Sequence, residues 1–161
     1  MHTRAIVRIL TGALFIAEGW AKITGTFVRG GFAGDLPDIA RGSVPFWRTF
    51  LEVFVVPHAS AAGWLIALGE LAVGIGLLLG LWTRLACVGG VALMLAIGMG
   101  GIRPHDAGAG WTGWVTASLS ARLALLLFVM LFTADAGKTW GLDGAMARRK
   151  EPSRLRRLGS A

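Results

Sequence analysis

Four ionisable side chains lie inside long apolar stretches of this sequence: Glu18, Lys22, Glu70 and Arg122. A charged group at the centre of a bilayer costs about 2.5–3.5 kcal/mol on insertion scales, so such groups usually face the interior of a helix bundle. Two of the four residues are acids and two are bases, and their formal charges cancel. They are therefore candidates for a ligand-binding site or a proton relay within a membrane.

The spacing of these residues predicts that they meet. Glu18 and Lys22 are four residues apart with the acid first, which allows an ion pair on one helix face. At a rise of about 1.5 Å per residue, Glu18 lies about 8 Å from the outer end of its helix, and Glu70 and Arg122 lie about 13 and 12 Å from theirs. Two interpretations remain open. The cluster is either an ion-pair network that fixes helix register or a polar pocket for a quinone headgroup or another small polar group, or for proton transfer.

Four apolar segments are long enough to position this cluster. A spanning helix needs about 20 mostly apolar residues. The composition, 55% hydrophobic and 16% charged, is also more apolar than that of soluble domains. We therefore expect an all-α integral membrane four-helix bundle, forming one domain over residues 1–143. The expected spans are residues 5–23, 61–82, 85–102 and 114–134.

A fifth apolar stretch, Pro45–Val56, lies in the long outer loop between the first two spans. About 12 residues are too few to cross a bilayer, and this stretch also carries Arg48 and Glu52. It is expected to form a short interfacial or re-entrant helix.

The basic residues predict the orientation of the chain. Four spans place both termini on one side, together with Arg4, Arg8, Arg84 and the basic tail at residues 144–161. Because cytoplasmic loops are enriched in Lys and Arg, both termini are expected in the cytoplasm. The tail holds six of the sixteen Lys and Arg residues. We expect it to meet anionic lipid headgroups rather than nucleic acid.

The cysteine and histidine content excludes several chemistries. A single cysteine, Cys87, can form neither an intramolecular disulfide nor a dithiol redox pair. His2, His58 and His105 fall at the terminus or in expected loops, so no span offers an axial ligand to a haem. We expect no metal site, no haem and no covalently bound cofactor.

Small residues four apart within the spans predict close helix packing. Gly76 and Gly80 form one such pair, and Ala17 and Ala21 form another. Small side chains at this spacing allow helix backbones to approach closely in lipid. We expect these pairs to pack the helices of the bundle together, and the alternative is contact between copies of the chain in a homo-oligomer.

Three short patterns occur in order along the chain. They are G-x6-G-x2-K at Gly12, Gly19 and Lys22, E-x3-G-x5-G-x2-T-R from Glu70 to Arg84, and G-x4-L-D from Gly137 to Asp143. With these patterns the sequence resembles the DoxX/DoxD family of small four-helix membrane proteins, over about residues 4 to 143.

The resemblance implies a function in electron transfer. Members of the family are described as subunits of thiosulfate:quinone oxidoreductase, or as partners in membrane oxidoreductase complexes that handle thiols. It implies a bacterial or archaeal plasma membrane, a quinone as electron acceptor, and other protein subunits as partners. The positions carried over are Lys22, Glu70 and Arg84. The alternatives are a non-catalytic accessory subunit of a larger membrane complex, and a small transporter.

Overall fold

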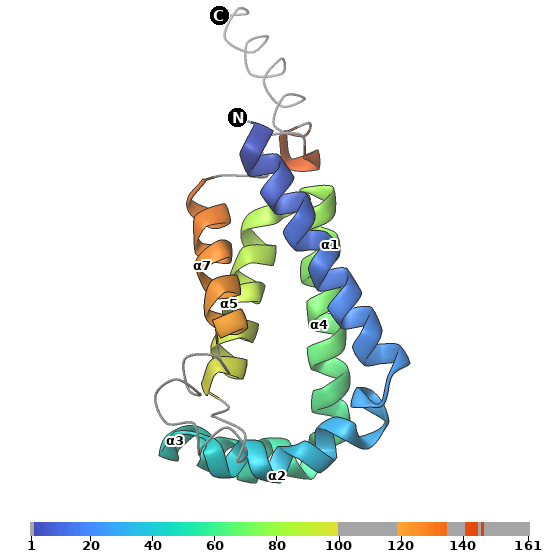
Figure 1. Cartoon of the computed structure of the whole chain (residues 1–161), viewed down its shortest axis with the longest axis vertical. Helices are drawn as coiled ribbons and strands as arrows, with labels where there is room; N and C mark the ends of the chain where they lie inside the picture. The colour runs from blue at the N-terminus through green and yellow to red at the C-terminus, as the bar shows by residue number, and fades with distance from the viewer. Residues whose placement is uncertain (1, 100–118, 135–140, 145, 147–161) are drawn as a thin grey trace, which may run out of the picture.

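The computed structural model describes residues 2–99, 119–134, 141–144 and 146, with the backbone alone described at residues 2 and 119–122. All regular structure in these residues is helical, without a strand, which agrees with the expected all-α class. Four long helices form the body of the described chain (Figure 1): α1 (His2–Thr24), α4 (Ala59–Leu79), α5 (Thr83–Met99) and α7 (Leu119–Thr133).

The long helices pack as two neighbouring pairs. Helix α1 lies along α4, and α5 lies along α7, while a short turn connects α4 to α5 (Figure 1). The largest buried cluster joins α4, α5 and α7, and its members are Val73, Leu77, Cys87, Met94, Phe128 and Leu131. Phe15 of α1 extends this core, because its ring lies edge-on to that of Phe128 at a centroid distance of 4.9 Å.

Glycines bring α1 and α4 into backbone contact. A Cβ atom added at Gly12 would lie 2.7 Å from the backbone nitrogen of Leu78, and one added at Gly74 would lie 2.7 Å from that of Ile16. One at Gly19 would lie 2.9 Å from the carbonyl oxygen of Ala67. Any larger side chain at these three positions would push the helices apart.

A layer of short helices lies across one end of the long helices (Figure 1), which we call the cap end; the layer comprises residues 27–58. Its elements are a π-helical turn η1 (Phe27–Gly31), α2 (Phe32–Gly42), α3 (Pro45–Phe50), a second π-helical turn η2 (Leu51–Val55) and a 3₁₀ turn η3 (Val56–His58). Its small core consists of Phe32, Leu36, Ala40 and Leu51. The Arg48 Nε donates a hydrogen bond of 3.0 Å to the carbonyl oxygen of Ala40, which ties α3 to α2.

This layer differs from the sequence-based expectation. The sequence predicts one short helix at Pro45–Val56, but α2 is a second helix in the same region. The residues from Pro45 also continue into α4 as one helical run, in which His58 departs from helical geometry with a φ of −121° and a ψ of 29°.

The opposite end, which we call the turn end, holds the connection between α4 and α5. Helix α4 ends at Leu79 because Gly80 takes a left-handed conformation, with φ 62° and ψ 36°. Asp143, far along the chain, closes this turn. Its carboxylate accepts hydrogen bonds of 2.9 Å from the backbone N–H groups of both Trp82 and Thr83, and its own N–H donates to the Gly80 carbonyl at 2.9 Å. The start of α5 is therefore capped by a distant segment.

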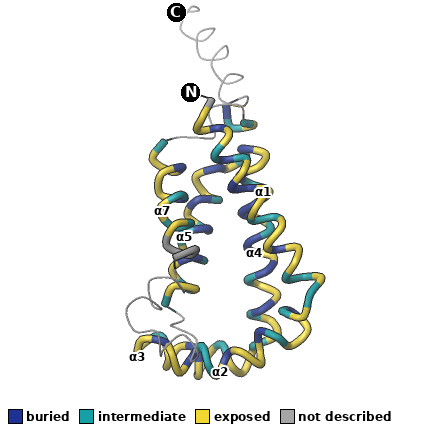
Figure 2. Tube along the Cα trace, viewed as in Figure 1, coloured by how far each residue is buried: buried dark blue, intermediate teal, exposed yellow. Residues whose placement is uncertain are grey.

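The outer faces of the long helices are apolar and exposed (Figure 2). Among the described residues, one helical run, Pro45–Leu79, is long and apolar enough to cross a membrane, with a mean hydropathy of 2.0. Within this run, only 33% of an apolar window of 18 residues is buried inside the protein. Leu65, Leu68 and Leu79 are among its exposed side chains. Helix α5 and the described part of α7 are apolar but shorter.

Candidate functional site

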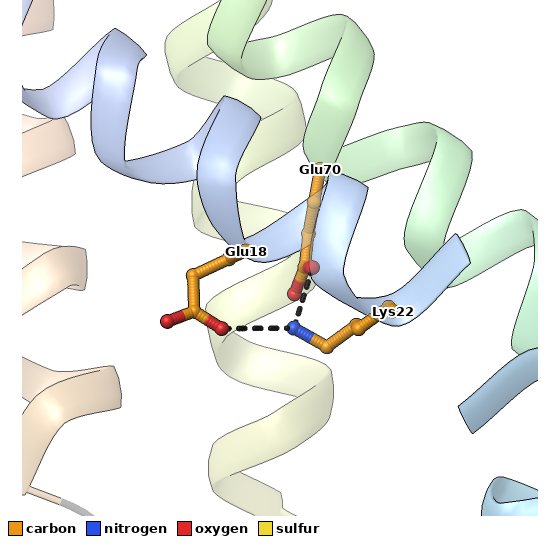
Figure 3. Close-up of polar contacts among 3 residues, drawn as sticks. All are labelled: Glu18, Lys22 and Glu70. Carbon is orange, nitrogen blue, oxygen red and sulfur yellow. Dashed lines mark hydrogen bonds and ion pairs between the residues drawn. The ribbon is translucent and has the colours of Figure 1, made fainter. Parts of the chain in front are cut away.

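Lys22 lies between two carboxylates near the cap end (Figure 3). Its Nζ donates a hydrogen bond of 2.6 Å to Oε2 of Glu70 and lies 3.5 Å from Oε2 of Glu18. Glu18 and Lys22 form the i, i+4 pair on α1 that their spacing predicts, and Glu70 reaches them from α4. We call these three residues the ion triad.

The two carboxylates of the ion triad have very different environments. The side chain of Glu70 is 4% exposed, that of Lys22 is 22% exposed, and that of Glu18 is 72% exposed. Lys22 therefore connects a buried acid to an open one. The sequence-based expectation of a fully inward-facing cluster is wrong for Glu18, because only the face of α1 that contains Gly12 and Gly19 is sealed against α4.

The close approach of α1 and α4 makes the buried pair possible. Gly19 lies one helical turn before Lys22 and touches the backbone of α4 at Ala67 and Leu71. Glu70 belongs to that same stretch of α4 and is directed toward α1 (Figure 3). The glycine contact thus sets the distance over which Lys22 reaches Glu70. A carboxylate buried to this extent requires such a partner, because an uncompensated charge would be strongly destabilising.

One aromatic ring contacts the ion triad, and a second lies further along α1. The ring of Phe27, in η1, has its centroid 5.8 Å from the Lys22 ammonium, at the distance of a cation–π contact. Phe15 lies on α1 one turn from Glu18 toward the turn end, and it packs against Phe128 of α7.

The ammonium of Lys22 has hydrogen-bonding capacity to spare. A lysine carries three N–H donors, and Glu70 and Glu18 account for two of them. The third donor suits a carbonyl or other acceptor oxygen, and the open side of Glu18 offers a carboxylate next to it. Among the described residues, no three His, Cys, Asp or Glu side chains gather as metal ligands would.

The fourth predicted member of the cluster, Arg122, belongs to α7, but its side chain lies outside the described residues. Among the described members, two carboxylates share one ammonium. The neutral cluster of four charges thus stays a prediction.

Two residues at the turn end were not predicted from the sequence. Arg8 is fully buried, and the Asp143 carboxylate attracts its charge. Arg8 lies near the start of the first expected span, residues 5–23, so its sequence position resembles that of an interfacial anchor. Asp143 belongs to the G-x4-L-D pattern, but the pattern does not reveal that it caps α5. Arg84 is exposed and lies 5.7 Å from the ring centroid of Phe132, in cation–π contact.

Exposed apolar helices around a buried ion pair are typical of a helical membrane protein. The chain belongs to the DoxX family, whose model matches residues 3–100. The match runs from α1 through α5 and includes the whole ion triad, while Arg122 and Asp143 lie beyond it. No curated protein and no solved structure matches the chain.

Proposed function

We propose that this protein is a membrane subunit of a quinone-linked oxidoreductase complex, and that the ion triad forms part of a pocket for a quinone or another small polar ligand. One observation carries the proposal: a single ammonium connects a buried carboxylate to an open one. Membership of the DoxX family supports the oxidoreductase context.

The proposal places the protein in a bacterial or archaeal plasma membrane. Helices α1, α4, α5 and α7 lie within the four spans, the cap layer lies at the outer surface, and both termini are cytoplasmic. The exposed leucines of α4 face lipid or neighbouring subunits. The basic tail at residues 144–161 rests against anionic lipid headgroups on the cytoplasmic side.

The residues of the ion triad have distinct roles in this pocket. Lys22 donates its third N–H to an acceptor oxygen of the ligand. Glu18, which is open, exchanges protons with the surroundings, and Glu70 holds Lys22 in place from the buried side. A bound quinone would accept electrons and protons. The electrons come from a partner subunit, because the only cysteine of the chain, Cys87, is fully buried in the core and lacks a second thiol.

Quinone retention tests this function. The full-length protein is purified from membranes in a mild detergent, and the quinone extracted from it is quantified per mole of protein. We expect quinone in the wild type, and a severalfold loss in Glu18→Gln and Glu70→Gln. Glu52→Gln is the matched control, because Glu52 is an exposed acid at the same end of the molecule.

Two results would contradict the proposed pocket. One is equal quinone retention in all four proteins. The other is a wild type that carries no quinone but co-purifies with partner subunits in a fixed ratio, which would identify a non-catalytic accessory subunit instead.

A further inference from the structure

A separate cavity of about 330 Å³ lies in the cap layer. Three elements line it: η1 with Phe27, Val28, Arg29 and Gly30, α2 with Ala33, and the first turns of α4 with Ala59, Ser60 and Gly63. Its volume falls within the range of small-molecule sites, about 300–1,000 Å³. None of the residues of the ion triad lines this cavity, although Phe27 contacts both.

Small side chains keep this cavity open. Most of its walls are Gly, Ala or Ser. Gly30 has a φ of 121°, and a Cβ atom added there would meet nothing within 4 Å. At Gly63 a Cβ atom would touch only the ring of Phe32, at 3.5 Å or more.

The polar groups of the cavity suit an anion. Arg29 is the charged residue in its lining, and Ser60 supplies a hydroxyl. Neither side chain has an ion-pair or hydrogen-bond partner within the part of the chain that the structure describes. The carboxylates of Glu18 and Glu70 contact Lys22. A guanidinium beside a hydroxyl binds a phosphate oxygen well, since Arg matches oxyanions with two parallel N–H donors.

The surroundings of the cavity indicate where such an anion comes from. Exposed aromatic side chains gather in the same end of the molecule, namely Trp20, Phe46, Phe50, Phe54 and Trp64. Of these residues, the tryptophans Trp20 and Trp64, at the ends of apolar helices, are typical of the level of lipid headgroups. Val28, Ala33 and Ala59 add apolar walls that suit the acyl chains of a lipid.

We propose that this cavity binds the phosphate headgroup of an anionic phospholipid, with Arg29 and Ser60 as the ligand-binding side chains. This site is independent of the proposed quinone pocket, because it uses none of the same polar groups. The lipid fills a space between η1, α2 and α4 and joins the cap layer to the bilayer.

Lipid titration in detergent tests the proposal. The full-length protein is titrated with fluorescent phosphatidylglycerol or phosphatidylcholine, and binding is followed by anisotropy. We expect the wild type to prefer phosphatidylglycerol. Arg29→Gln should weaken its binding by about tenfold or more, since a charge-assisted hydrogen bond is lost. Ser60→Leu, at an exposed position, should weaken it as well by filling the cavity.

The matched control is Arg41→Gln, because Arg41 is exposed in the same layer but does not line the cavity. It should leave binding unchanged, and the thermal unfolding of all variants is measured in parallel. The proposal is overturned if Arg29→Gln and Ser60→Leu bind phosphatidylglycerol like the wild type, or if Arg41→Gln loses as much affinity as Arg29→Gln. If inorganic phosphate at millimolar concentration displaces the lipid and the two lipids bind equally, the site takes a soluble anion, and the lipid assignment is wrong.

Discussion

At the scale of single residues, Lys22 is the centre of the candidate site. It is the cation that both carboxylates of the ion triad contact. Removing Lys22 would leave the Glu70 carboxylate buried without its partner. The resulting loss in the free energy of unfolding is larger than the net contribution of the intact pair. The value of Lys22 for stability therefore depends on the presence of Glu70.

A double-mutant cycle tests this dependence. Lys22→Met should lower the free energy of unfolding by about 3–5 kcal/mol, because it leaves a buried carboxylate uncompensated. The double variant Lys22→Met with Glu70→Met should recover much of that loss, since two apolar side chains can replace a buried pair at little cost. Unfolding in detergent, followed by circular dichroism, measures both effects. Additive losses from the two substitutions would refute the buried pair.

Two substitutions at Glu70 distinguish the effect of its charge from the effect of its hydrogen bond. Glu70→Gln keeps the shape and hydrogen-bonding capacity of the side chain, so the folded yield should stay close to that of the wild type. Glu70→Leu removes the hydrogen-bond acceptor of Lys22, which keeps only the open carboxylate of Glu18, and should reduce the folded yield severalfold. Size-exclusion chromatography after purification measures this difference. Equal yields for both variants would show that the hydrogen bond to Lys22 contributes little to assembly.

Much of the ion triad could be predicted from the sequence. The i, i+4 spacing indicates the pair of Glu18 and Lys22, and the depth estimate places Glu70 at a similar level of the membrane. The difference in burial between Glu18 and Glu70 could not be predicted, because it depends on which face of α1 meets α4. The burial of Arg8 could not be predicted from the sequence either, because Asp143, which attracts its charge, lies at the far end of the chain.

At the scale of elements, three glycines determine how α1 and α4 pack. Gly12, Gly19 and Gly74 lie in backbone contact between the two helices, with Gly12 and Gly19 seven residues apart on one face. The sequence-based expectation named other small residues. Ala17 and Ala21 are exposed, and Gly80 forms a left-handed turn. Gly76 does pack closely, because a Cβ atom added there would lie 3.1 Å from the Cβ of Ala86 on α5. Spacing alone identifies small residues but not the helix that they meet.

Enlarging Gly12 should therefore separate the helices. Gly12→Leu places a side chain against the backbone of Leu78 and Gly74, and overpacking of this kind costs about 1–3 kcal/mol or more. The melting temperature should fall, and quinone retention should fall with it because Lys22 moves away from Glu70. Ala17→Leu is the control, since it adds comparable bulk at an exposed position of the same helix. A similar melting temperature for both variants would contradict the glycine contact.

The capping of α5 by Asp143 is a second property of the elements. Asp143→Ala removes both hydrogen bonds to the backbone at Trp82 and Thr83 and should cost about 1–2 kcal/mol, the usual effect of losing a helix cap. Asp143→Asn should cost less, because its amide oxygen still accepts a hydrogen bond. Thermal unfolding in detergent measures both variants, with Asp35→Ala as an exposed control. A neutral Asp143→Ala variant would show that the cap does not stabilise the fold.

At the scale of the whole molecule, the two ends have opposite characters. The cap end holds an ion triad with one open carboxylate and a cavity lined by the cation Arg29. At the turn end, Arg8 is buried, and the Asp143 carboxylate accepts hydrogen bonds from the backbone between α4 and α5. The sequence predicted the helical class and the apolar segments, but it did not predict α2. That segment contains Pro37 and charged residues, which are typical of a loop. Its buried face in the structure consists of Phe32, Leu36 and Ala40, which are spaced four residues apart in the sequence.

This difference between the ends leads to a test of orientation in the membrane. If the basic tail lies in the cytoplasm, the cap end faces outward. The position chosen for labelling is Asp38 in α2, whose exposed pair with Arg41 contributes little stability, so its replacement should leave the fold intact. Cys87 is buried and is replaced by serine to remove background labelling.

In intact cells, a membrane-impermeant maleimide should label Asp38→Cys but not a cysteine at Ser153 in the tail. In inverted membrane vesicles the pattern should reverse. Labelling of Asp38→Cys only in inverted vesicles would place the ion triad and the Arg29 cavity on the cytoplasmic side, and any quinone or lipid would then reach them from that leaflet.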